Sequence, residues 1–427
     1  MNIDASNIRY FLNNIRNKGF FHLLSANVLI QVFAFASQLF VAGIISPDDL
    51  GRIKIIQTYL AIFSIIAGMG FNSSVLKICS ENHTAKENSK YFSSAFIFTL
   101  ITSSLTYTII LIINHLGYLS KDLLVKFLIP LGMLPLITNS IFALFMALFQ
   151  AKKEIKLFSN LTIFNKLISI VGIIVLTYFF GINGYYVAYN LSFIILILVA
   201  FIFFKRIFPF TLSIKNFGLF KEHWKYAKYS TLSNIIEDTS TYIDILLISF
   251  MINDMENIGY YSFALTLTVL YKLFPSSVQQ ITIPYVSSFK SNKDEFLKIF
   301  RRYNRLLYIV VVATLVISVM LAPIFIEIVF GGKYNQSISF FIFLSIGWSI
   351  RHLIQLQSAA IFGLGQIKYN ALTSLCGLLA NIIIYPIAIY SLGLMGAAYA
   401  SISSGLIVWI ASKFYFRKAV QHTEWKE

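Results

Sequence analysis

Apolar runs long enough to cross a membrane recur along almost the whole chain, and no other feature restricts its fold as strongly. A helix needs about 20 apolar residues to cross roughly 30 Å of hydrocarbon. Only 12% of the 427 residues are charged, whereas soluble domains are about a quarter charged. The sequence therefore predicts an all-α membrane protein with twelve transmembrane helices. These are expected at residues 20–45, 52–78, 91–115, 123–150, 157–180, 184–205, 227–251, 258–284, 303–329, 337–362, 368–391 and 394–416.

The distribution of basic residues predicts the orientation of the chain. Of its 34 Lys and Arg residues, the connections on the side opposite the termini hold only Arg52, Lys54, Lys121, Lys126 and Lys333. Lys and Arg collect in cytoplasmic loops, so both termini are predicted to be cytoplasmic. The net charge of +16 is then explained by the basic residues that collect in the cytoplasmic connections. No nucleic-acid partner is predicted, because the charges form no continuous basic patch with interleaved aromatic residues.

The two halves of the chain resemble each other at a constant offset of 212 positions. The offset predicts a duplicated six-helix unit, with one half at 1–212 and the other at 213–427. Two copies with an even number of helices have the same orientation, so a pseudo-two-fold axis along the membrane normal and a central cavity between the halves are expected. The matching pairs are Gly181 with Gly393, Tyr91 with Tyr303, Ile155-Lys156 with Ile367-Lys368, and Lys205-Arg206 with Arg417-Lys418.

The seventh predicted helix, 227–251, carries three carboxylates, Glu237, Asp238 and Asp244. Ionisable residues in a membrane helix almost always face a bundle interior or a watery cavity. At about 100° per residue, Glu237 and Asp244 lie on one polar stripe, with Asp238 about 100° away. They are candidate ion-coupling groups. The alternative is that they form structural ion pairs with Lys or Arg of neighbouring helices.

The first predicted helix carries a polar stripe without charge. Asn27, Gln31 and Gln38 lie on one of its faces, and Asn234 belongs to the stripe of the seventh helix. Because the duplication makes the two helices equivalent, both stripes are expected to face the shared cavity.

Three basic residues fall within predicted spans. Arg351 is the strongest candidate for an anionic headgroup, because a planar guanidinium binds phosphate oxygens in pairs. It could equally be the partner of an acidic residue of the seventh helix. Lys272 and Lys166 are further cationic candidates, and either could instead extend toward an interface. Arg52 and Lys54 are interpreted as a solvated rim.

Two short patterns give the chain a family resemblance. The pattern Gly-x-x-Gly-x-x-x-Ala begins at Gly181 and again at Gly393, before the sixth and twelfth predicted helices. Segment 147–153 (Ala-Leu-Phe-Gln-Ala-Lys-Lys) is echoed by segment 360–366 (Ala-Ile-Phe-Gly-Leu-Gly-Gln). With the twelve spans and two halves, these patterns resemble the Wzx-type O-antigen flippases of the polysaccharide transporter family. That family belongs to a superfamily with the MATE drug exporters and the lipid II flippases.

The resemblance implies movement of an undecaprenyl-diphosphate-linked oligosaccharide across a bacterial inner membrane by alternating access. Arg351 and Lys272 would hold the diphosphate, with Lys166 as a further substrate contact. Gln38 and the other amides would bind sugar, and the carboxylates would couple the cycle to H⁺ or Na⁺. The glycan polymerase and the chain-length machinery are expected partners, and no cofactor or metal is expected.

Three other functions remain open from the sequence. A MATE-like multidrug antiporter of the same fold would have an acidic cavity, which the seventh helix alone would allow. A membrane glycan polymerase or ligase would need a large external loop, and the predicted external loops are short. A channel or scaffold is not excluded by composition. Because the chain has no phosphate-binding glycine loop and no metal-ligand spacing of histidines, no enzyme is predicted.

Overall fold

The computed structural model describes residues 20–81, 83–207, 218–269, 293–423 and 425. Every regular element in these residues is a helix, as the sequence predicts. The bounds are α2 (Phe20–Ile44), α3 (Pro47–Gly68), α4 (Phe71–Cys79), α5 (Ala85–His115), α6 (Leu123–Met133), α7 (Pro135–Ala151), α8 (Ile155–Ile207), α9 (Phe220–Met251), a helix over residues 255–269, α11 (Lys293–Phe330), α12 (Ser337–His352), α13 (Gln355–Gly363) and α14 (Lys368–Gln421).

Seven helical segments in the described residues are long and apolar enough to cross a membrane. The number differs from the twelve runs of the sequence partly because α8 and α14 each contain two of the predicted spans. Their backbone leaves the helical region at Gly181 (φ 58°, ψ −141°) and at Gly393 (φ 60°, ψ −145°). α9 is too polar to be counted among the seven.

The two kinks have the same geometry at the same offset of 212 positions. Close packing follows each of them in the same way. A Cβ on Gly184 would lie 1.8 Å from the carbonyl oxygen of Leu176, and one on Gly396 would lie 1.9 Å from that of Ala388. Only glycine fits where the backbone approaches so closely. This correspondence supports the predicted duplication, which stays a prediction.

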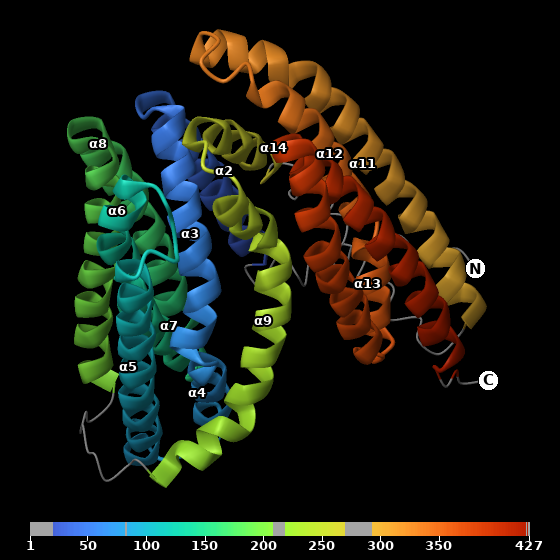
Figure 1. The fold of residues 1–427 in the computed structure, drawn as a ribbon. Helices are drawn as coiled ribbons and strands as arrows, with labels where there is room; N and C mark the ends of the chain where they lie inside the picture. Colours follow the sequence, from blue (N-terminus) through green and yellow to red (C-terminus); the bar gives the residue numbers. More distant parts are fainter. Residues whose placement is uncertain (1–19, 82, 208–217, 270–292, 424, 426–427) are drawn as a thin grey trace.

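The helices form two groups with α9 between them (Figure 1). One group contains α2 to α8, and the other contains α11 to α14. α9 contacts α3 and α4 of the first group and α14 of the second. Its approach to the first group is very close, because a Cβ on Gly70 would lie 2.5 Å from the carbonyl oxygen of Ala227. The first helix of the second half in sequence is thus packed largely against the first half.

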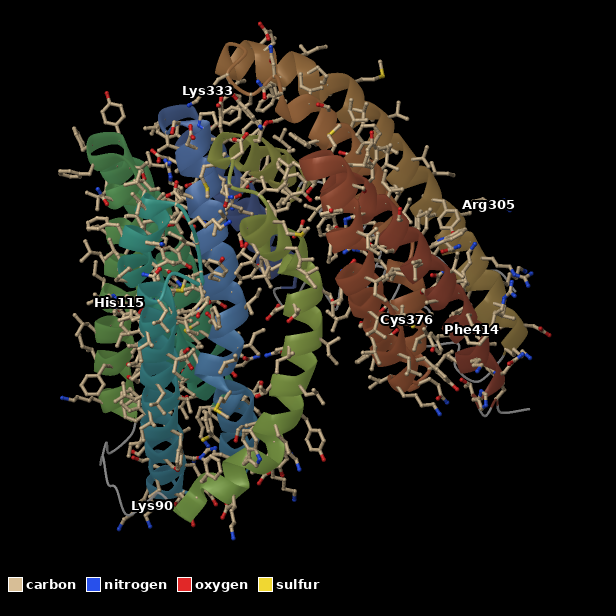
Figure 2. The ribbon with its side chains drawn as sticks, viewed as in Figure 1. Lys90, His115, Arg305, Lys333, Cys376 and Phe414 are labelled. Atoms are coloured by element: carbon tan, nitrogen blue, oxygen red, sulfur yellow. The ribbon has the colours of Figure 1, made fainter. Side chains whose placement is uncertain are left out.

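The hydrophobic cores differ between the two ends of the molecule. One large core joins both groups, and it contains Tyr186 of the first group with Tyr334 and Phe341 of the second. Toward the other end the cores are separate. The first group packs around Phe92, Phe145 and Phe204 with Ala227 of α9. The second packs around Phe296, Phe300, Leu356 and Val420. The two groups are therefore joined at the end that carries Lys333 and separate toward the end that carries Lys90 (Figure 2).

Candidate functional site

A cavity of about 450 Å³ lies between α2, α3, α8, α9 and the helix at residues 255–269. The polar stripe of the first predicted helix reaches it, as the sequence predicts, through Gln38. α8 contributes polar side chains on one side, and Tyr242 of α9 lies on the other. The polar lining residues are Ser37, Gln38, Lys54, Gln57, Asn165, Lys166, Ser169, Tyr185, Tyr189, Tyr242, Ser262 and Thr266.

The charged residues in the described lining of this cavity are both cationic. Lys54 and Lys166 contribute the two charges, and none of the described lining residues is Asp or Glu. The remaining polar groups are amides and hydroxyls, and Gln57 Nε2 donates to Tyr185 Oη over 2.5 Å. Ammonium groups in an environment of low dielectric attract anions more strongly than they do in water. The cavity therefore suits a ligand with negative charge and many hydroxyl groups.

The interpretation of Arg52 and Lys54 as one solvated rim is wrong for Lys54. Residues two apart on a helix point about 200° from each other. Arg52 pairs with Asp49 (Nη1 to Oδ1, 2.9 Å) and with Asp122 (Nη2 to Oδ2, 3.1 Å). Lys54 points to the other side and lines the cavity. The sequence held a signal for this, because Lys54 and Gln57 are three residues apart and share a helix face.

Arg351 lies in a packed network within the second group. Its Nη2 donates to Ser404 Oγ (2.8 Å) and to Asn381 Oδ1 (3.2 Å), both on α14. The guanidinium also lies 5.8 Å from the centre of the Trp348 ring. Asn381 Nδ2 in turn donates to the carbonyl oxygen of Ser240 on α9 (3.2 Å). Arg351 therefore links α12 to α14 and, through Asn381, to α9.

Asp244 is buried between the cavity and this network. Its side chain is 8% exposed, and Tyr261 Oη donates to its Oδ2 over 3.3 Å. Electrostatic attraction reaches it from Arg351 and from Lys54. The structure thus brings together an acidic and a basic residue that the sequence singled out separately, and adds Lys54 to them.

A second cavity, of about 190 Å³, lies between α3, α4, α5, α7 and α9. Asn234 and Asp238 of α9 line it, together with Asn72, Asn139 and Ser140 of the first group. It carries no basic residue in its described lining. Amides, a hydroxyl and a carboxylate can bind neutral hydroxylated groups or a cation.

The structure places the predicted site residues in three places. Gln38 and Lys166 line the cationic cavity, Asn234 and Asp238 line the second cavity, and Asp244 and Arg351 belong to the packed network. The side chains of Asn27, Gln31 and Glu237, and the whole of Lys272, lie outside the described residues. Lys54, Gln57 and Asn165 were missed by the sequence analysis. No group of three His, Cys, Asp or Glu side chains within the described ranges could hold a metal ion.

The end of the molecule where the groups are joined is closed by Lys333. This residue lies in the turn between α11 and α12, and its Nζ donates to the carbonyl oxygens of Ala42 (3.0 Å), Gly43 (3.1 Å) and Ile45. Tyr334 Oη also donates to Ala42 over 2.9 Å. Burial lowers the pKa of Lys333 below its usual range. One basic side chain of the second group thus satisfies the final carbonyls of α2.

The N-terminal end of α9 is fixed to the first group by His223, which precedes the predicted span at 227–251. The His223 ring is buried. Its Nε2 lies 3.0 Å from the carbonyl oxygen of Tyr91, and its Nδ1 lies 2.8 Å from Ser74 Oγ. A carbonyl only accepts, so Nε2 carries the proton and Ser74 donates to Nδ1. Burial lowers the pKa of His223 to about 4.

Long apolar helices around a polar internal cavity indicate a multi-pass membrane protein, and comparisons with known proteins point to a transporter. Residues 40–339 match the family model described as polysaccharide biosynthesis protein. The chain belongs to this family, and the resemblance seen in the sequence is confirmed.

Relatives and solved structures support the same class. A putative O-antigen transporter of Shigella flexneri is 24% identical over 180 residues, which cover 42% of this chain and 43% of that protein. The match thus spans less than half of that transporter. A probable low-salt glycan biosynthesis flippase of Haloferax volcanii is 24% identical over 94% of this chain and 80% of its own length. The fold is similar to the lipid II flippase MurJ in an inward closed conformation, with a TM-score of 0.77 at 18% identity, over 93% of this chain and 89% of that structure. The relatives and this solved structure are named as a transporter and flippases, so the similarities point to a transporter.

Proposed function

We propose that this protein is a flippase that moves an undecaprenyl-diphosphate-linked oligosaccharide from the cytoplasmic to the periplasmic leaflet of a bacterial inner membrane. The observation that carries the proposal is the cavity whose described lining contains Lys54, Lys166 and neutral polar groups and no carboxylate. A diphosphate needs cations, and sugar hydroxyls need amides and hydroxyl groups. The family and the relatives support a lipid-linked glycan as the substrate.

The packing supports loading from the side that the basic residues mark as cytoplasmic. The groups share one core near Lys333 and have separate cores at the other end. A substrate headgroup would enter between the two helix groups at the end where their cores are separate, and it would bind at Lys54 and Lys166. The contacts of Lys333 would then break and the entry end would close. The headgroup would leave at the end that carries Lys333. Both termini would be cytoplasmic. The polymerase and chain-length machinery would receive the glycan on the outer side.

Asp244 offers a route to ion coupling within this scheme. In the structure it attracts Lys54, which lines the cavity, and Arg351, which holds the second group together. A bound diphosphate would compete for Lys54 and weaken its attraction to Asp244. The carboxylate would then take up H⁺ or Na⁺, because an uncompensated charge in a buried site is costly. Asp238 and Glu237 would serve as further uptake groups on the same helix.

Coupling is testable in vesicles that carry an imposed pH or sodium gradient. In Asp244→Asn protein we expect flipping of a fluorescent lipid-linked glycan to continue at a rate that no longer responds to the gradient. A response equal to that of the unaltered protein would remove Asp244 from coupling, and it would leave the glycan assignment intact.

The substrate assignment is tested by glycan export in cells that lack their own copy of the gene. Lys54→Ala should reduce surface glycan by about tenfold or more, because it removes a cation opposite the diphosphate. Lys54→Arg should retain most of the export. Lys90→Ala, at an exposed position far from the cavity, is the matched control. Lipid-linked glycan should accumulate on the cytoplasmic leaflet in the Lys54→Ala cells.

A multidrug antiporter of the same fold is the competing function, and the same variants separate the two. A cationic drug is repelled by two lysines, so Lys54→Ala should then improve drug export while surface glycan stays unchanged. That pair of results would contradict the flippase proposal.

A further inference from the structure

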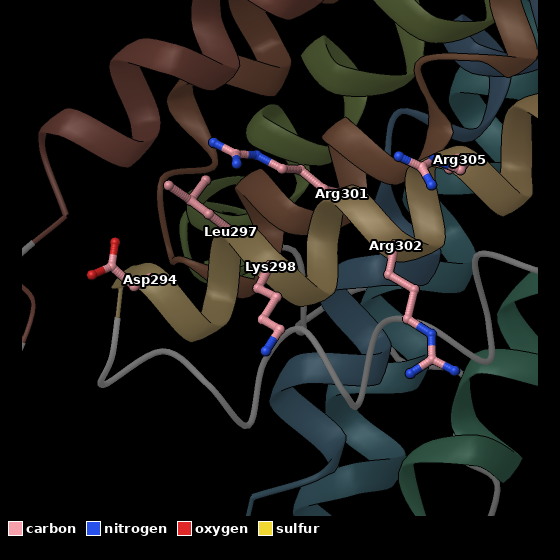
Figure 3. Close-up of a pocket in the computed structure, with 6 residues that line it drawn as sticks. All are labelled: Asp294, Leu297, Lys298, Arg301, Arg302 and Arg305. Atoms are coloured by element: carbon pink, nitrogen blue, oxygen red, sulfur yellow. The ribbon is translucent and has the colours of Figure 1, made fainter. Parts of the chain in front are cut away.

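The outer face of α11 carries a cluster of basic side chains that the proposed transport cycle does not use. Lys298, Arg301, Arg302 and Arg305 are all exposed, and together with Leu297 and Asp294 they line a hollow of about 560 Å³ (Figure 3). We call these four residues the α11 basic cluster. They lie at spacings of three and four, so they share one side of the helix.

The side chains of the cluster form two rows. Lys298 and Arg302 point in one direction, and Arg301 and Arg305 point in another (Figure 3). Each is three or four residues from another cation, an arrangement that destabilises a helix unless anions are present. Asp294 is the one carboxylate in the described lining of the hollow, so four positive charges there face one negative charge. The cluster therefore has unused capacity to bind an anion.

Packing on the opposite side of α11 fixes the direction in which the basic cluster faces. The opposite face of α11 is anchored by Phe300, whose ring stacks 4.4 Å from that of Phe416. Phe296 is fully buried and packs 5.3 Å from Trp425 near the end of the chain. Arginine forks that are held in place can form paired hydrogen bonds with phosphate oxygens.

The surface that follows the cluster indicates what kind of anion it would bind. Directly after Arg305, α11 exposes large apolar side chains at Leu306 (46%), Ile309 (60%), Val312 (56%) and Val316 (51%). A helix face that changes from basic to apolar within one turn matches the boundary between lipid headgroups and acyl chains. A soluble anion would use only the first part of this face, whereas a lipid would use both.

We propose that the α11 basic cluster binds the phosphate headgroup of an anionic phospholipid of the cytoplasmic leaflet, with its acyl chains along the apolar face that follows. The site would hold a resident lipid on the outside of the second group. It would fix the depth of α11 in the membrane, and it is separate from the cavity with Lys54.

The test is lipid binding to the purified full-length protein, measured by native mass spectrometry with phosphatidylglycerol and phosphatidylcholine as probes. The cluster variant replaces Lys298, Arg301, Arg302 and Arg305 with Gln. The matched control replaces four exposed lysines on α5 and α9, Lys86, Lys90, Lys221 and Lys225, with Gln and so has the same net charge. We expect the cluster variant to bind phosphatidylglycerol about tenfold more weakly than the unaltered protein, and the control to change by less than about twofold. Binding of phosphatidylcholine should be similar in all three.

Two further measurements keep the test decisive if the cluster variant folds poorly. Replacing only the three arginines with Lys keeps the charge and should keep most of the binding. The unaltered protein should lose phosphatidylglycerol as salt is raised, because screening weakens exposed charges. Equal loss of binding in the control, or no effect of salt, would overturn the proposal. If glycerol 3-phosphate bound as tightly as the lipid, the cluster would be a site for free anions and the proposal would be wrong. If poly-glutamate bound more tightly than the lipid, the cluster would be a docking surface for an acidic protein, and the proposal would also be wrong.

Discussion

Two basic residues on either side of Asp244 have opposite surroundings. Lys54, in the first group, lines an open cavity, and it has no hydrogen-bond partner among the described residues. Arg351, in the second group, uses one nitrogen for both Ser404 and Asn381 and lies against Trp348. A charged donor whose hydrogen bonds are unused is available to a ligand, whereas one with fixed partners holds helices together. The comparison favours a substrate contact at Lys54 and a structural role for Arg351, and the substrate role predicted for Arg351 stays a prediction.

The largest expected effect is loss of stability in Arg351→Ala. The change removes two hydrogen bonds and leaves Asp244 with weaker compensation for its buried charge, which should lower the free energy of unfolding by about 3 kcal/mol or more. The midpoint of thermal unfolding in detergent measures this. Arg351→Lys should lose less, because the charge remains. If Arg351→Ala kept its unfolding midpoint but lost glycan binding, the contrast with Lys54 would fail and Arg351 would be a substrate contact.

His223 extends the comparison to a buried polar residue that has partners but no charge. Its pKa is about 4 in the folded protein, against an ordinary value of 6.5. Between pH 6.5 and pH 4, His223 is protonated in the unfolded chain but stays neutral in the folded chain. The free energy of unfolding should therefore fall by about 3 kcal/mol between pH 6.5 and pH 4.

The pH effect is measured as the unfolding midpoint of unaltered and His223→Gln protein across this range. Glutamine can replace both hydrogen bonds but does not titrate, so the variant should show a flatter profile. Parallel profiles would show that other groups cause the acid sensitivity.

The smallest expected effect concerns Lys333, whose partners are all backbone carbonyls of α2. Lys333→Met keeps the length of the side chain and removes the three hydrogen bonds to Ala42, Gly43 and Ile45. Each such bond contributes about 1 kcal/mol, partly offset by the methionine packing. We expect an increased population of the outward-open state, measured as faster labelling of a cysteine placed at Gln57 by an impermeant thiol reagent added from outside. Unchanged labelling would mean that the shared hydrophobic core alone closes this end.

Much of the architecture could be predicted from the sequence because it depends on local composition. Apolar runs must form helices in a membrane, since backbone groups have no water there to bind. The glycines at 181 and 393 marked sharp turns, because only glycine adopts such backbone angles without strain. Gln38 lines a cavity, as the periodicity of its polar stripe predicted, whereas the side chains of Asn27 and Gln31 lie outside the described residues.

Which charged residues share a space was decided only by the tertiary structure. The sequence left Arg351 open between a substrate contact and a partner of an acidic residue, and it placed Lys54 at a rim, because distance along a chain says nothing about which faces of separate helices meet. The position of α9 against the first group brought Asp244 between Lys54 and Arg351 and placed Asn234 and Asp238 in another cavity. Composition determined that this is a helical membrane protein with polar stripes, and the packing of helices far apart in sequence determined which stripe faces an opening and which is enclosed.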